Sequence, residues 1–343
     1  MKRAVVICPG RGTYNKAELG YLSKNFPDRD MLAGFDETRE ACGQETVSAL
    51  DSADRFSLAK HTRGDNASAL IFASSLGDFL AINGEAIDIV AVTGNSMGWY
   101  TTLACAGAVS AQNGFRIANT MGTLMQEHLV GGQLVYPFTD TEWRPDEAKL
   151  AGLLDLVRSI HEVDGALLHV SIRLGGMLVL AGNEAGLSAF EQAVEPVQDR
   201  FPLRLANHAA FHTPLVRHVS EMGRDDLPVS LFRIPTIPMI DGRGKIWWPH
   251  ACNLAALHDY TLGTQVTETY DFSHAVAIAA REFAPDLFIV AGPGNTLGGA
   301  VAQALIMADW QDLNSKTTFI ERQQSDRPVL ASMGLAEQRA SVT

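Results

Sequence analysis

The segment Gly94-Asn95-Ser96-Met97-Gly98 constrains the fold of this chain more than any other. It follows the apolar, strand-like residues 87–92 and precedes the helix-compatible residues 99–108. Small residues on both sides of Ser96 allow the backbone to turn sharply and to present the hydroxyl group outward, as a nucleophile elbow requires. The amide of Met97 would begin the helix and point at a developing oxyanion. We therefore predict a strand, a turn with a nucleophilic serine and a helix; the alternative is an ordinary tight turn.

The composition is that of a globular protein with a core of its own. The chain has 343 residues, of which 46% are hydrophobic and 19% are charged, which is enough for one large domain or two smaller ones. No apolar run reaches the roughly 18 residues of a membrane-spanning helix. A net charge of −12 argues against a general nucleic-acid binder. The four cysteines show no C-x-x-C spacing, so we expect a cytoplasmic protein without a zinc or redox site.

Strand and helix patterns alternate along the chain. Residues 132–203 show a β-α-β-β-α pattern, which predicts a small ferredoxin-like α+β subdomain. We assign a larger α/β core to residues 1–131 and 204–323, and we expect residues 324–343 to form a polar, loosely held tail. The strands expected in the core cover residues 3–8, 87–92, 236–240 and 286–290, and its clearest helices cover residues 67–82 and 115–129.

A serine nucleophile needs a general base, and His212 has the most suggestive setting of the ten histidines. Thr213 and Pro214 can cap and begin a helix directly after it, and such a junction holds a side chain in place while leaving it accessible. The alternative is a surface histidine in a loop. No companion acid is evident, but a backbone carbonyl can also orient the imidazole. His208 and His212 have the spacing of a helical metal site, but Pro214 argues against a continuous helix, so we expect no metal.

Several short segments stand in the order and at the spacing of the motifs of one enzyme family over about residues 3–305. They are Pro9-Gly10-Arg11-Gly12-Thr13, the serine segment, Met121-Gly122-Thr123-Leu124-Met125-Gln126, Ala210-Phe211-His212-Thr213-Pro214-Leu215, Gln265 seven residues before Phe272, and Gly292-Pro293-Gly294. Together they resemble the malonyl-CoA:acyl carrier protein transacylase family, which includes the acyltransferase domains of polyketide synthases.

The resemblance implies an α/β-hydrolase-like core with an inserted ferredoxin-like subdomain, and a ping-pong acyl transfer. Ser96 would take the acyl group from an acyl-CoA or acyl-carrier-protein thioester, with His212 as base, and would pass it to an acyl carrier protein. The backbone carbonyl of Gln265 would orient the histidine, and the amides of Met97 and Arg11 would form the oxyanion hole. No cofactor, nucleic acid or membrane is implied, and we expect a monomer.

The departures from the family pattern lie at the acyl pocket. Met121 takes the place of the arginine that grips the malonyl carboxylate, and a thioether cannot do this. We therefore expect an acyl group other than malonyl, although Arg11 or Arg173 could hold a carboxylate from another direction if it is not simply solvated. The other residues expected at the acyl pocket are Asn95, Trp99, Phe211 and Met177.

Two further functions remain open at this stage. A hydrolase of the same fold would strip acyl groups from carrier proteins, and the loss of the arginine does not separate it from a transferase. A non-catalytic docking protein would not need the serine and histidine motifs. If the partner is an acidic carrier protein, basic residues near the cleft should contact it, with Arg204 and Arg217 as candidates.

Overall fold

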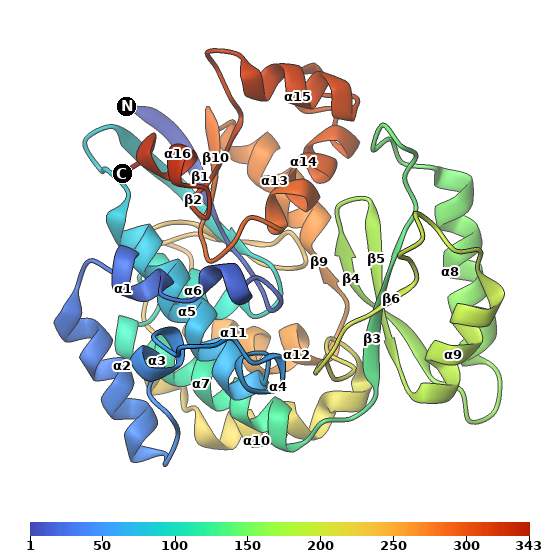
Figure 1. Ribbon diagram of the computed structural model, residues 1–343, viewed down its shortest axis with the longest axis horizontal. Coiled ribbons are helices and arrows are strands. Elements are labelled where there is room, and N and C mark those ends of the chain that lie inside the picture. The colour runs from blue at the N-terminus through green and yellow to red at the C-terminus, as the bar shows by residue number, and fades with distance from the viewer.

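Two β-sheets organise the chain in a computed structural model that describes residues 1–343 (Figure 1). The larger sheet has the strand order β11-β10-β1-β2-β7-β8, and all its neighbours pair in parallel except β7 and β8. Its central strand β1 is a continuous apolar run that is buried from Ala4 to Cys8, as a parallel strand with both faces covered requires. The strands are β1 (Lys2–Cys8), β2 (Ile87–Gly94), β7 (Met239–Ile240), β8 (Ile246–Trp247), β10 (Leu287–Val290) and β11 (Leu330–Ser332).

Helices pack around this sheet, and none of them combines the length and apolarity needed to cross a membrane. The longest, α5, is buried along most of its length and lies against α7. The two helices approach closely because both carry glycine at the contact: a Cβ atom on Gly122 would lie 2.7 Å from the carbonyl oxygen of Gly64. The helices are α1 (Tyr21–Asn25), α2 (Arg29–Ala41), α3 (Val47–Asp51), α4 (Leu58–His61), α5 (Gly64–Ala81), α6 (Gly98–Cys105), α7 (Ala111–Glu127), α10 (Arg217–Asp226), α11 (Leu254–Asp259), α12 (Gln265–Thr267), α13 (Phe272–Phe283), α14 (Leu297–Met307), α15 (Lys316–Gln324) and α16 (Ala336–Ala340).

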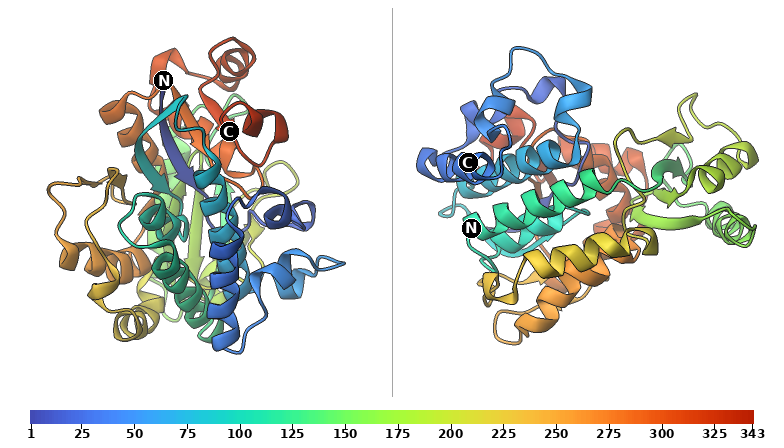
Figure 2. Two further views of the ribbon diagram at one scale, coloured as in Figure 1. Left: turned by 90° about the vertical axis from the view of Figure 1, so that its left-hand side faces the viewer. Right: turned by 90° about the horizontal axis from the view of Figure 1, so that it is seen from below.

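The second sheet forms a subdomain that projects from the core (Figure 2). Its order is β6-β3-β5-β4-β9, and the first four strands have the arrangement of a βαββαβ ferredoxin-like unit, which confirms that prediction. Helices α8 and α9 cover one face, so the other face is turned toward the core. The elements are β3 (Gly132–Pro137), α8 (Glu147–His161), β4 (Leu168–Leu174), β5 (Met177–Gly182), α9 (Glu184–Ala193) and β6 (Leu203–Arg204).

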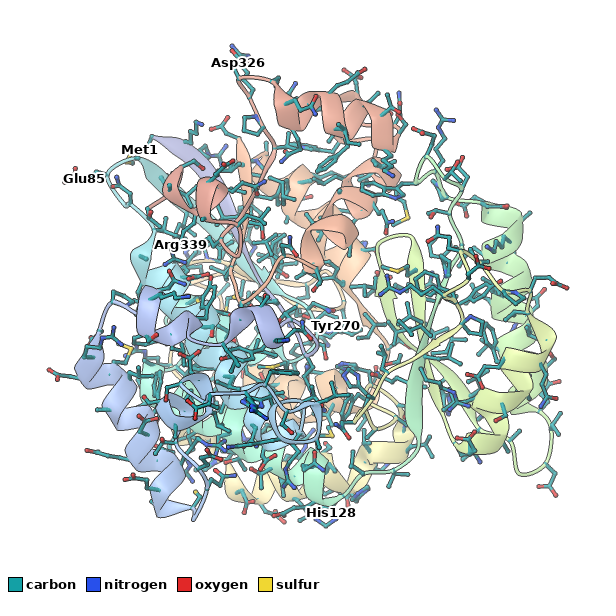
Figure 3. The ribbon with its side chains drawn as sticks, in the orientation of Figure 1. Met1, Glu85, His128, Tyr270, Asp326 and Arg339 are labelled. Atoms are coloured by element: carbon teal, nitrogen blue, oxygen red, sulfur yellow. The ribbon has the colours of Figure 1, made fainter.

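The short strand β9 (Tyr270–Asp271) joins the two parts. It pairs in parallel with β4 of the subdomain and leads directly into α13 of the core. Tyr270 lies at the junction of the two sheets (Figure 3), and its hydroxyl donates a 2.6 Å hydrogen bond to the carbonyl oxygen of Gly94. The end of β2 is therefore tied to the subdomain.

The prediction of a loosely held tail over residues 324–343 is wrong. Strand β11 pairs with β10 and completes the large sheet, and Leu330 and Met333 are buried. In α16, the guanidinium group of Arg339 forms an ion pair with the buried carboxylate of Asp78 on α5 (Figure 3). The prediction rested on the polar composition of this segment. Its few apolar residues pack into the core and its Arg339 pairs with Asp78, and these contacts hold the segment in place.

Candidate active site

The turn between β2 and α6 has the backbone geometry of a nucleophile elbow. Ser96 has a φ of 54°, in the left-handed region that a sharp strand-to-helix turn imposes on this position. The glycines on either side are required by close approach: a Cβ atom on Gly94 would lie 2.5 Å from the backbone of Gly98, and one on Gly98 would lie 2.2 Å from the carbonyl oxygen of Cys8. Strand, turn and helix therefore stand as the sequence predicts.

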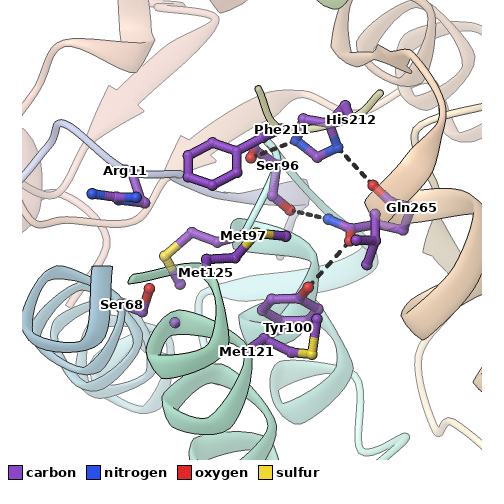
Figure 4. Close-up of a pocket in the computed structure, with 12 residues that line it drawn as sticks. Arg11, Ser68, Ser96, Met97, Tyr100, Met121, Met125, Phe211, His212 and Gln265 are labelled. Atoms are coloured by element: carbon purple, nitrogen blue, oxygen red, sulfur yellow. Dashed lines mark hydrogen bonds between the residues drawn. The ribbon is translucent and has the colours of Figure 1, made fainter. Parts of the chain in front are cut away.

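His212 is placed to act as the base of Ser96 (Figure 4). Its Nε2 atom lies 2.8 Å from Ser96 Oγ, and its Nδ1 atom lies 2.6 Å from the carbonyl oxygen of Gln265. A carbonyl can only accept, so Nδ1 carries the proton and Nε2 is free to accept from the serine hydroxyl. Burial lowers the pKa of His212 to about 4, against the hydrogen bond to Gln265, which raises it. The imidazole is therefore neutral near pH 7.

Gln265 contacts the nucleophile as well as the base. Its carbonyl is free for His212 because α12 ends at Thr267, and carbonyls in the last turn have no donor within the helix. Its side-chain Nε2 donates to the Ser96 carbonyl oxygen at 3.0 Å, and its Oε1 accepts from the Tyr100 hydroxyl at 3.2 Å. Tyr100 was not predicted at the site, although its position one helical turn after Ser96 was a usable signal.

Two backbone N–H groups beside Ser96 donate to no protein acceptor, namely those of Met97 and Arg11. Met97 stands at the N-terminal end of α6, where the helix dipole favours negative charge. The loop that carries Arg11 packs directly on the serine turn, since a Cβ atom on Gly10 would lie 2.7 Å from the carbonyl oxygen of Asn95. These two amides are the ones that the sequence predicts for an oxyanion hole, and that role stays a prediction.

A small chamber opens beside Ser96 toward α5 and α7 (Figure 4). Its volume is about 40 Å³, measured as the space in which a water-sized molecule can be centred. Met121, which was expected at the acyl pocket, lines it, and so does Met125, one turn further along α7, which was not predicted. The lining residues are Arg11, Ser68, Ser96, Met97, Tyr100, Met121, Gly122, Met125, Phe211, His212, Gln265 and Val266.

Arg11 supplies the single guanidinium group of this chamber, and it has no carboxylate partner. One of its terminal nitrogens donates to the carbonyl oxygens of Thr62 and Asn207, at 2.7 and 2.8 Å, and the group lies over the ring of Phe211. Its Nε is buried without a partner. Burial lowers the pKa of Arg11 to about 10, against a smaller opposing effect of Asp65, so the side chain stays charged near pH 7.

A much larger cleft reaches Ser96 from the other side, between the core and the open face of the ferredoxin-like sheet. Its volume, measured in the same way, is about 520 Å³. Asn95 and Met177 line this cleft rather than the chamber, and the buried Oδ1 atom of Asn95 has no hydrogen-bond partner. Apolar side chains of the sheet form most of the far wall: Val135, Ile172, Leu174, Val179 and Leu203.

The structure places Trp99 and Arg173 outside the site, so both were assigned wrongly. Trp99 is fully buried, and its Nε1 atom donates to Thr261 Oγ1 at 3.0 Å. Arg173 lies between Ile172 and Leu174 on β4; because side chains alternate along a strand, those two face the cleft and Arg173 faces away. It pairs with Asp271 at 3.7 Å.

No cluster of three or more histidine, cysteine, aspartate or glutamate side chains is placed to hold a metal ion. His208 and His212 do not share a helix face, because both lie in the loop before the 3₁₀ turn Pro214–Val216. His208 directs its Nδ1 atom at Gln133 Oε1, 2.8 Å away, while His212 faces Ser96.

Solved structures with the same fold cover the whole chain. The malonyl-CoA:ACP transacylase of Synechocystis sp. PCC 6803 is 16% identical with a TM-score of 0.75, and covers 100% of both chains. An acyl-carrier-protein S-malonyltransferase of Burkholderia pseudomallei 1710b is 19% identical with a TM-score of 0.73, and covers 99% of each. The transacylase PlMCAT, solved in complex with the type II polyketide synthase acyl-carrier protein AntF, is 17% identical with a TM-score of 0.73, covering 99% of this chain and 98% of that one.

These neighbours define the architecture of the chain as an α/β core with a ferredoxin-like subdomain. More specifically, it is the fold of malonyl-CoA:ACP transacylases, as the sequence motifs predict. No protein-family model matches the sequence, and no curated protein matches it significantly.

Proposed function

We propose that this protein transfers an acyl group from a thioester donor, through an ester on Ser96, to the thiol of an acyl carrier protein. The observation that carries the proposal is the continuous line of hydrogen bonds from Ser96 through His212 to the carbonyl of Gln265. Two unpaired amides lie beside it, and two spaces meet at the serine. This arrangement is typical of an acyl-transfer enzyme with a serine nucleophile.

In the first half-reaction Ser96 Oγ attacks the thioester carbonyl while its proton moves to His212 Nε2. The negative charge that develops on the carbonyl oxygen is stabilised by the N–H groups of Met97 and Arg11. The imidazolium formed at His212 is stabilised by its hydrogen bond to Gln265. When the intermediate collapses, the carbon–sulfur bond breaks and His212 returns the proton to the leaving thiolate, which leaves an ester on Ser96.

In the second half-reaction the thiol of the carrier protein's phosphopantetheine arm reaches the ester through the large cleft. His212 Nε2 takes the thiol proton, sulfur attacks the ester carbonyl, and the proton passes to Ser96 Oγ as the ester bond breaks. Apart from His212, the chamber is lined by no histidine, aspartate or glutamate that would activate a water molecule for attack. The acyl-enzyme should therefore persist until a thiol arrives.

The acyl group is proposed to be uncharged, and therefore not malonyl. Met121 gives no charged partner to a carboxylate, and a carboxylate buried without one carries a large desolvation cost. One observation favours a second candidate: the unpartnered Nε of Arg11 could donate to the carboxylate of a charged acyl group. Relative rates with malonyl-CoA and acetyl-CoA distinguish the two.

The carrier protein is proposed to dock on basic residues at the mouth of the cleft. Arg204 is neutralised by Glu184 and Glu191, so its charge is not available to an acidic partner. Arg217 is exposed and has no carboxylate partner, and Arg200 is an exposed basic residue that lines the cleft. Charge reversal at Arg200 and Arg217 should slow transfer to the carrier protein more than it slows acylation by acyl-CoA.

Intact-mass spectrometry tests the proposal. The wild-type protein is mixed with acyl-CoAs and acyl carrier proteins, and Ser96→Ala serves as the control. We expect a mass increase equal to the acyl group in the wild type and none in Ser96→Ala. The isolated acyl-enzyme should lose the group to carrier protein much faster than to buffer. Rapid loss in buffer that carrier protein does not change would make the protein a hydrolase, and absence of any adduct would refute acyl transfer.

A further inference from the structure

Two spaces of very different size meet at Ser96, and a thioester must use both. The carbonyl carbon carries an acyl arm and a sulfur arm, and the sulfur arm has to extend from Ser96 to a carrier protein outside the molecule. Only the cleft, at about 520 Å³, has room for such an arm, since it falls within the roughly 300–1,000 Å³ of ligand-binding pockets. The acyl arm is left with the chamber beside α7.

The chamber is too small for a long chain. Measured in the same way, the 40 Å³ of the chamber is less than a tenth of the 520 Å³ of the cleft. From this contrast we infer, resting on the proposed acyl transfer, that the substrate is a short-chain acyl thioester, such as acetyl, propionyl or butyryl.

Close helix packing holds the wall of the chamber that α7 forms. Helix α7 is held against α5 by the contact between Gly122 and Gly64, where a single added Cβ atom would already be too close. The sulfur of Met121 packs against α10 so closely that a Cβ atom on Gly223 would lie 2.6 Å from it. Movement of either wall would require a shift of whole helices, which close-packed interiors resist.

Arg11 and Phe211 close the chamber on the side of the cleft. The Arg11 guanidinium group bridges the carbonyl oxygens of Thr62 in the core and Asn207 next to the subdomain, and it lies 5.3 Å from the centre of the Phe211 ring. The same two loops are joined by a 2.6 Å hydrogen bond from Asn207 Nδ2 to Thr62 Oγ1. On this side, an acyl chain that outgrows the chamber therefore meets side chains that hydrogen bonds and stacking hold in place.

Met125 is the residue we assign to setting the length limit. It is partly exposed, whereas Met121 is fully packed between helices, so shortening Met125 enlarges the chamber with less damage to the core. It lines the same chamber as Arg11 and Phe211 (Figure 4). Met125→Ala removes the thioether and its flanking carbons, which is room for about three more acyl carbons.

The experiment measures single-turnover acylation of Ser96 by acetyl-, propionyl-, butyryl-, hexanoyl- and octanoyl-CoA. For the wild type we expect a drop of about tenfold or more between butyryl and hexanoyl, the size of effect that an extra methylene gives in a closed apolar pocket. Met125→Ala should bring hexanoyl to within about threefold of butyryl. Met31→Ala, which removes a half-buried methionine from α2 outside both spaces, should keep the wild-type profile.

Equal rates for butyryl and octanoyl in the wild type would overturn the inference, as would an unchanged length profile in Met125→Ala that still forms the acyl-enzyme. These outcomes differ from failure of the proposed function, in which no acyl-CoA modifies the wild type at all. A variant Met125→Phe, which fills the chamber, gives the opposite check: acetyl should be retained and butyryl should be lost.

Discussion

The pH dependence of acylation tests the environment of His212 most directly. The base acts as the neutral imidazole, so acylation is lost as the pH falls through the folded-state pKa of His212. Burial lowers the pKa of His212 to about 4 from the ordinary 6.5, because the charged ring loses its hydration. The hydrogen bond to the Gln265 carbonyl oxygen favours the charged form but does not make up for this loss. At pH 5.5 the neutral fraction is then about 97%, against about 9% for an ordinary histidine, a contrast of about tenfold.

Rapid-quench measurements of Ser96 acylation between pH 4.5 and 8, at constant ionic strength, give the profile. We expect a rate that is close to maximal down to about pH 5.5. The same shift lowers acid stability: an unfolded histidine takes up its proton near 6.5 and the folded one only near 4, so the free energy of unfolding decreases as the pH falls through that interval. Tryptophan fluorescence at each pH therefore has to show that the fold is intact.

His212→Ala is the control, and its residual rate should show no inflection that belongs to the base. An inflection near pH 6.5 in the wild type, with the fold intact, would mean that water reaches the ring. The short, buried hydrogen bonds from His212 to Ser96 and Gln265 would then not describe the working state of the site.

Three other predictions concern the base, the acyl group and the C-terminal segment. His212→Ala should slow acylation by about 10²–10⁴, the usual contribution of a general base, and an unchanged rate in a quench assay would point to another base. Met121→Arg should raise the rate with malonyl-CoA relative to acetyl-CoA by roughly tenfold or more. If the wild-type protein already prefers malonyl-CoA, Arg11 and not residue 121 binds the malonyl carboxylate. Arg339→Met should lower the free energy of unfolding by about 3 kcal/mol, because it leaves the buried carboxylate of Asp78 without its cation, and urea denaturation that shows no change would contradict this role.

Much of the local structure could be predicted because it depends on neighbours in the chain. The glycines around Ser96 permit a sharp turn between an apolar strand and a helix, and the structure has that turn. The order of strands and helices in the ferredoxin-like subdomain follows from the switch between a period of two and a period of 3.6. The placement of His212 before a capped turn followed from Thr213 and Pro214 in the same way.

Side-chain direction across elements could not be predicted, because periodicity sets which residues share a face but not what that face meets. Trp99 and Tyr100 are both apolar residues at the start of α6, and only the packing of the helix turns Tyr100 to Gln265 and Trp99 into the core. On β4, the alternation was visible in the sequence, but whether Arg173 or its neighbours Ile172 and Leu174 faced the cleft depended on where the core lies.

The remaining features join segments that are distant in sequence. The sequence alone determined that a serine would stand on a strand–turn–helix and that a histidine would precede a capped turn, since both rest on steric and hydrogen-bonding preferences within a few residues. Only the tertiary structure decided that the Gln265 side chain supports Ser96, that Arg11 closes a small chamber, and that residues 330–332 complete the large sheet. Each of these contacts brings together groups more than 40 residues apart, and their formation depends on the packing of the whole chain rather than on any local pattern.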